Sequence, residues 1–180
     1  DIVDPDLTAH LPVHLADPGV GHRQHRVILG DERDRAQRLR AGGARQCKSA
    51  GERERRDQLQ AMAKDLGVGA HVHWINGFCE TEELLDYLSA ADVYVTPYLN
   101  PAQVTSGTLA YAVGLGKPVV STPYVHAAEL LGGGHGRLVD FEDSAGFADA
   151  IANLLEDEVA LMDLRKRTYA LGRQMIWPRL

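Results

Sequence analysis

The sequence predicts an α/β fold built on a doubly wound, mostly parallel sheet. Two observations support this prediction. Short apolar segments rich in Val and Ile alternate with longer segments whose apolar residues recur at helical spacing, and Gly, Pro or capping residues separate the two kinds. Strands that alternate with helices form right-handed βαβ units, in which helices cover both faces of the sheet. At 180 residues the chain fits a single domain with a sizeable core.

The first half of the chain contains two predicted strands and two predicted helices. Residues 26–30 form a buried-type strand that ends at a glycine, and residues 71–75 form the next strand. Between them lies a helix that Gly67 ends. Its apolar side chains recur at i, i+3, i+4 and i+7, at Leu59, Met62, Ala63 and Leu66. Thr81 is the expected N-cap of the second helix, which carries two acids in its first turn.

The second half repeats this alternation more regularly. Strands are predicted at residues 93–96, 119–122 and 136–139. Ser144 is expected to cap a helix that buries Phe147, Ile151, Leu154 and Leu155, and a last helix runs from about residue 159 to Gly172. In doubly wound sheets ligands bind beyond the carboxyl ends of the strands, which places the loops after Thr96 and Thr122 at the expected binding site.

The loop after the 93–96 strand carries the clearest binding signal. Ser106, Gly107 and Thr108 open a short helix that ends at residues 114–116. The N–H groups at a helix start, with the positive end of its dipole, attract anions. Gly107 allows a ligand to approach the backbone, and the hydroxyls of Thr105, Ser106 and Thr108 can donate to phosphate oxygens. We therefore predict a phosphate site at residues 105–108; the alternative is that these small residues only cap the helix.

Composition and charge exclude several other classes of protein. A formal net charge of −6 gives no general attraction to nucleic acid or anionic membranes. Cys47 and Cys79 lack the spacing of a disulfide framework or zinc site, and no apolar run approaches the roughly 18 residues of a membrane span. The eight His residues show no ligand spacing, so no metal is expected. We expect a cytoplasmic protein with neither a transmembrane segment nor a nucleic-acid partner.

Residues 1–56 differ from the rest of the chain. Between residues 31 and 56, eight Arg and one Lys are interleaved with acids, apolar residues are almost absent, and three prolines interrupt residues 1–22. This composition indicates a solvated, irregular segment, because the acids cancel the positive field and no aromatic residues accompany the Arg. We therefore divide the chain into an irregular, Arg-rich segment, 1–56, around the strand at 26–30, and an α/β domain, 57–180.

Several short motifs of the second half occur in a recognisable order. They are Ala91–Pro97, then Gly116–Val120 as Gly-x-Pro-Val-Val, then Glu129–Val139 as Glu-x-x-x-x-Gly-x-Gly-x-Leu-Val, preceded upstream by His73–Gly77 and Glu83–Leu85. With these motifs, residues 53–177 resemble the nucleotide-sugar-binding, C-terminal half of a retaining glycosyltransferase of family 4 (group 1), which has the two-domain GT-B fold. The resemblance implies a Rossmann-like fold for this domain.

The resemblance also implies the ligand and several site residues. It predicts binding of a nucleotide-sugar of the UDP or GDP type and transfer of its sugar to the hydroxyl of an unknown acceptor, without a cofactor. Family members carry two glutamates that bind the donor sugar and the ribose; here Gln103 and Tyr111 occupy those positions. Their amide and hydroxyl groups can still form hydrogen bonds. His126 and Glu129 are expected to be neighbours of the donor site.

Other features of the family have no counterpart in these 180 residues. Family members have an N-terminal acceptor domain and a basic Arg–Lys pair that clamps the diphosphate; neither is recognisable here, and no catalytic residue is assigned. We therefore expect the chain to be inactive on its own. Two interpretations stay open, the donor-binding half of a hexosyltransferase and a non-catalytic sugar-nucleotide-binding or scaffold domain. A dinucleotide-dependent oxidoreductase is disfavoured, because no Gly-x-Gly-x-x-Gly follows the first strand.

Overall fold

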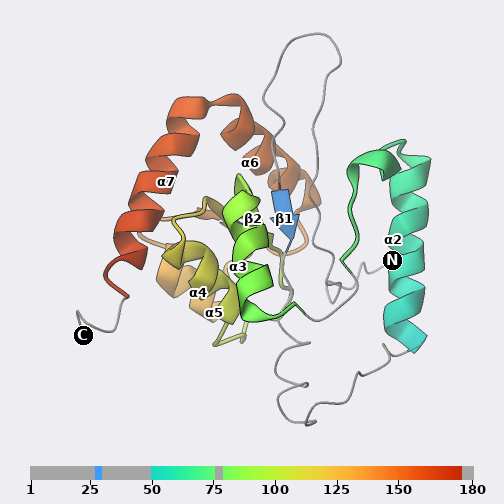
Figure 1. Ribbon diagram of the computed structural model, residues 1–180, viewed down its shortest axis with the longest axis horizontal. Helices are drawn as coiled ribbons and strands as arrows, with labels where there is room; N and C mark the ends of the chain where they lie inside the picture. Colours follow the sequence, from blue (N-terminus) through green and yellow to red (C-terminus); the bar gives the residue numbers. More distant parts are fainter. Residues whose placement is uncertain (1–26, 30–49, 76–78, 176–180) are drawn as a thin grey trace.

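The structure is a computed structural model that describes residues 27–29, 50–75 and 79–175 (Figure 1). Its strands are β1 (Val27–Leu29), β2 (Val93–Thr96), β3 (Val119–Ser121) and β4 (Arg137–Leu138). Its helices are α2 (Ala50–Asp65), α3 (Thr81–Ala90), α4 (Gly107–Gly114), α5 (Val125–Leu131), α6 (Ser144–Glu156) and α7 (Glu158–Gly172), with a 3-10 turn η1 at Gly69–His71. No helix in these ranges has both the length and the hydropathy to cross a bilayer.

The four strands form one parallel sheet in the order β1-β2-β3-β4. Neighbouring residues of β2 point to opposite faces, as the twofold repeat of a strand requires. Tyr94 packs with Val119 and with apolar residues of α3, α4 and α5, while Val93 and Val95 pack with Val120 and with leucines of α6 and α7. Helices therefore cover both faces of the sheet, which confirms the predicted doubly wound arrangement.

The strand predicted at residues 71–75 does not form. Gly67, at φ +72°, ends α2, and the chain then turns through η1, in which the His71 N–H donates to the Val68 carbonyl. The first residue of the predicted strand belongs to this turn. Residues 72–75 pair with none of the described strands, and Figure 1 shows α2 and the segment after it set apart from the other helices.

The helix predicted around Leu59 is confirmed, although its apolar face is not buried as the pattern suggests. Ala63 is buried, but Met62 is 50% and Leu66 is 69% exposed, because α2 lies away from the sheet. The helix begins at Ala50, so the last residues of the Arg-rich segment are helical and the boundary at residue 57 falls inside α2. The rest of that segment and Cys47 lie outside the described residues.

Two predicted helix caps are displaced by one residue. The N-cap of α6 is Asp143, whose carboxylate accepts from the Gly146 N–H at 2.8 Å, and Ser144 is the first helical residue. The N-cap of α3 is Glu80 and not Thr81, and its side chain makes no capping hydrogen bond. A carboxylate is as good an N-cap as a hydroxyl, so sequence preference alone does not choose between Asp143 and Ser144.

Candidate functional site

The start of α4 is fixed by Ser106, which is fully buried. Its backbone is extended, at φ −137° and ψ 105°, and its Oγ accepts a hydrogen bond from the Leu109 N–H at 3.2 Å. Its carbonyl oxygen accepts from the Ala110 N–H. These are the bonds of an N-cap serine, which satisfies one of the N–H groups that the first helical turn cannot pair internally. Ser106 therefore sets the direction in which α4 leaves the loop.

The loop between β2 and α4 is ordered by its own polar groups. Asn100 starts a turn in which its Oδ1 accepts from the Ala102 N–H at 3.1 Å and its carbonyl accepts from the Gln103 N–H at 3.2 Å. The Gln103 amide nitrogen then donates to the Thr105 carbonyl at 2.7 Å. Side-chain to backbone bonds of this kind stabilise a loop without regular secondary structure.

The first residues of α5, which follow the loop after β3, are hydrogen-bonded to the first loop. The Val125 N–H donates to the Pro101 carbonyl at 3.1 Å, and the His126 N–H donates to the Gln103 carbonyl at 3.2 Å. In the opposite direction, the Ser106 N–H donates to Nδ1 of His126 at 2.8 Å. The loops after Thr96 and Thr122 therefore meet at the start of α4, where the sequence places the binding site.

The four predicted phosphate-binding residues lie together but differ in exposure. Thr105 is exposed, Gly107 is half-buried, and Ser106 and Thr108 are buried. The Ser106 N–H is used by His126, whereas the Gly107 N–H donates to no acceptor in the described part of the chain. Gly107 is thus a residue of the first helical turn whose N–H stays available for hydrogen bonding to a ligand, as far as the described residues go.

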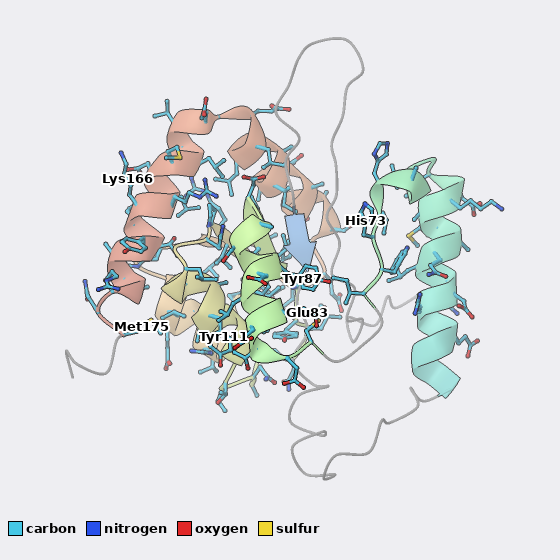
Figure 2. All side chains as sticks on the ribbon, viewed as in Figure 1. His73, Glu83, Tyr87, Tyr111, Lys166 and Met175 are labelled. Carbon is cyan, nitrogen blue, oxygen red and sulfur yellow. The ribbon has the colours of Figure 1, made fainter. Side chains whose placement is uncertain are left out.

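The other predicted site residues are placed around this point. Gln103 is half-buried in the loop, and Tyr111 lies on α4, where it packs against the apolar residues around Leu109 (Figure 2). His126 is in the first turn of α5. Glu129 is exposed and lies one turn further along α5, which begins at Val125. Its carboxylate acts on His126 through its charge.

Burial changes the protonation of His126. The pKa of His126 is lowered from its usual value, mainly because burial disfavours the charged ring, and the carboxylate of Glu129 opposes this shift. A neutral imidazole also agrees with the hydrogen bond from the Ser106 N–H, since only an unprotonated Nδ1 can accept it.

Beneath the loops, buried aromatic and hydroxyl groups support the site. Thr122, the residue after β3, donates its hydroxyl hydrogen to the Tyr98 carbonyl, and Ser121 donates to the Thr96 carbonyl. The rings of Tyr98 and Tyr124 pack edge to face with centroids 5.1 Å apart. These contacts connect β2 and the segment after it to the end of β3 and the segment after it, so both loops are supported by the same packed groups.

Sequence reasoning missed the role of Lys117. Its side chain is 6% exposed, and its ammonium donates to the carbonyls of Ser89 at 2.7 Å and Ala91 at 2.9 Å. Burial, with a smaller effect of the nearby Arg165, lowers the pKa of Lys117, while Asp92 acts in the other direction. Lys117 thus satisfies carbonyls at the end of α3. The only sequence signal for this role is a Lys just before a buried strand.

Comparison with known proteins gives a consistent family. Residues 27–157 match the family described as "Glycosyl transferases group 1". The chain is 33% identical over 110 residues to D-inositol 3-phosphate glycosyltransferase 1 of Catenulispora acidiphila, a match that covers 61% of this chain and 26% of that protein. It is 30% identical over 127 residues to the lipopolysaccharide core biosynthesis glycosyltransferase LpsE of Rhizobium meliloti, covering 70% and 35%. The chain therefore spans about a quarter to a third of these relatives.

Solved structures share the fold. The C-terminal domain of the group 1 glycosyl transferase LpcC from Francisella tularensis superposes with a TM-score of 0.63 at 17% identity, over 70% of this chain and 64% of that one. Anabaena HepE, solved in complex with UDP, superposes with a TM-score of 0.62 at 23% identity, over 70% and 34%. The predicted Rossmann-like fold of a C-terminal glycosyltransferase domain is confirmed.

Proposed function

This chain belongs to the group 1 glycosyltransferases, and we propose that it binds the nucleotide-sugar donor with the donor diphosphate at the start of α4. One observation carries the proposal. The loop that follows β2 is hydrogen-bonded near that helix start to the first residues of α5, and the Gly107 N–H is left without an acceptor among the described residues. The UDP complex of HepE, a protein of the same fold, supports a nucleotide as the ligand class.

The proposed reaction is the transfer of the donor sugar to an acceptor hydroxyl, with retention of configuration as the family resemblance implies. Breaking the bond between sugar and phosphate leaves negative charge on the diphosphate. Fixed N–H donors and the positive end of α4 stabilise that charge without having to reorganise. Gly107 supplies the N–H, and the hydroxyls of Thr105 and Thr108 flank it.

Gln103 and Tyr111 take the places of the two family glutamates in this proposal. The Gln103 amide nitrogen is bound to the Thr105 carbonyl, which leaves its Oε1 as an acceptor for a sugar hydroxyl. Tyr111 offers one phenolic hydroxyl to the ribose. Neutral hydrogen bonds are about half as strong as charge-assisted ones, so the donor would be held less tightly on the sugar side than on the phosphate side.

The test is calorimetric titration of the full chain with UDP-glucose and GDP-mannose. Gly107→Val should raise the dissociation constant at least about tenfold, because a branched side chain would stand where the diphosphate approaches the backbone. Gly114→Val is the matched control, since Gly114 is at the other end of α4 and a Cβ there would meet nothing within 4 Å. Equal affinity of the wild type and Gly107→Val would contradict the placement of the diphosphate.

A further inference from the structure

The hydrogen bond from the Ser106 N–H to His126 points to a structural role for the imidazole. We propose that His126 is a positioning residue whose neutral ring, protonated on Nε2 only, holds the start of α4 in the geometry that binds the donor diphosphate. The inference rests on the proposed function. It goes beyond that function by naming the side chain that holds the start of α4 in place, and the protonation of that side chain as the change that breaks the contact.

The hydrogen bond fixes the tautomer of the ring. The Ser106 backbone nitrogen can only donate, and it lies 2.8 Å from Nδ1 of His126. Nδ1 must therefore carry a lone pair, so the single proton of the neutral ring is on Nε2. An imidazolium has N–H groups on both nitrogens, and its Nδ1–H would face the Ser106 N–H directly. The contact exists only while the ring is neutral.

The same contact determines which backbone N–H groups an anion can use. Because the Ser106 N–H is bound to the ring, it is not open to an anion, whereas the N–H of Gly107, the first residue of α4, has no acceptor in the described ranges. Ser106 is also the N-cap, so moving its backbone would move the first turn of the helix. The imidazole thus acts on the diphosphate through Ser106, without having to touch it.

The surroundings of His126 favour the neutral ring. The facing loop, residues 100–106, contains no ionisable side chain. On its own helix, the carboxylate of Glu129 is the charge that acts on His126 among the described residues, and it favours protonation. Burial has the larger effect and lowers the pKa of His126 below the usual 6.5. The ring therefore stays neutral near pH 7 and gains its second proton only in acid.

Two roles for this histidine predict opposite effects of pH. If the ring positions Ser106, a second proton breaks the contact, and affinity for the donor falls as the pH is lowered through the pKa of His126. If the ring instead binds the diphosphate directly as a cation, a second proton adds an attractive charge, and affinity rises in acid. UDP-glucose is the suitable probe, because its diphosphate is a diester with no proton to gain near neutral pH.

The experiment measures binding of UDP-glucose to the full chain by calorimetry between pH 8 and pH 5, for the wild type and three variants. We expect the wild type to lose roughly tenfold in affinity toward acid, the size of one lost hydrogen bond. His126→Asn places an amide oxygen where Nδ1 was, so it should bind like the wild type at pH 8 and lose the pH dependence. His126→Leu should bind weakly at every pH. His135→Asn, the control at another half-buried histidine, should keep the wild-type profile.

The bond between the His126 backbone N–H and Gln103 persists in all of these variants, so they isolate the ring. Nitrogen-15 spectra of the histidine rings at pH 8, without nucleotide, supply an independent reading, in which His126 should show a proton on Nε2 and none on Nδ1. The opposite tautomer, tighter binding in acid, or wild-type affinity in His126→Leu would each overturn the positioning role. Absence of nucleotide binding by the wild type at every pH would overturn the proposed function, and this inference with it.

Discussion

Replacing Lys117 tests how much one buried side chain contributes to the stability of the domain that carries the candidate site. Its ammonium is buried and donates to the carbonyls of Ser89 and Ala91, at the end of α3. Replacing it with Met keeps an unbranched apolar stem of similar length up to Cε while removing the ammonium, and with it the charge and both hydrogen bonds. The substitution therefore measures what the two hydrogen bonds contribute to the free energy of unfolding, with little change in packing.

The two carbonyls are not equivalent, and this decides the size of the effect. Ser89 is exposed, so water can replace Lys117 as the donor to its carbonyl. Ala91 is 1% exposed, and its carbonyl would be left without a partner, which costs about 1–3 kcal/mol. Relief of the desolvation of the buried ammonium, the same effect that lowers the pKa of Lys117, offsets part of this cost. The expected net loss in free energy of unfolding is about 1–2 kcal/mol.

Urea unfolding followed by circular dichroism measures this difference as a lower midpoint at an unchanged slope. Lys166→Met is the matched control, because Lys166 lies on the exposed side of α7, where a substitution should change the free energy of unfolding by less than about 0.5 kcal/mol (Figure 2). A Lys117→Met protein as stable as the wild type would show that the Ala91 carbonyl does not depend on this ammonium, and the structural role assigned to Lys117 would be wrong.

Two further substitutions test the site and its support. Tyr111→Phe should weaken binding of UDP-glucose by about 0.5–1.5 kcal/mol, the value of one net hydrogen bond, as measured by calorimetry; equal affinity would mean that the ring only packs. Gly116→Ala should lower the free energy of unfolding by about 1–3 kcal/mol, because Gly116 has φ +69° and a Cβ there would lie 2.7 Å from Cβ of Tyr169. Gly114→Ala, with open space around it, is the control, and similar effects of both changes on urea unfolding would argue against this reasoning.

Local patterns predicted the elements that form the site. The end of α4 before Gly116, the strand at Val119 and the loops after Thr96 and Thr122 all follow from capping, turn and burial signals within a few residues. Contacts between distant residues were not predictable in this way. The bond from Ser106 to His126 joins residues 20 positions apart, and those from Lys117 join residues 26 and 28 positions apart.

The failed predictions have the same origin. The apolar residues of α2 and the strand-like composition of residues 71–75 are local signals for burial against the sheet. Whether they are buried depends on where the chain places them, and in this structure α2 and the segment after it lie apart from the other helices (Figure 1). A periodic pattern predicts the type of an element better than it predicts the partner of that element.

Gln103, which takes the place of the first family glutamate in our proposal, also holds the loop in shape. The Gln103 amide nitrogen donates to the Thr105 carbonyl at 2.7 Å. A carboxylate at this position has no hydrogen to donate, and it would set two acceptors against each other. The loop that carries Thr105 and Ser106 to the start of α4 is therefore built for an amide at residue 103. The backbone carbonyl of Gln103 also accepts from the His126 N–H, so one residue braces both loops of the candidate site. In our proposal Gln103 can still offer Oε1 to the donor while it keeps the loop in shape, two tasks that a glutamate could not combine in this conformation.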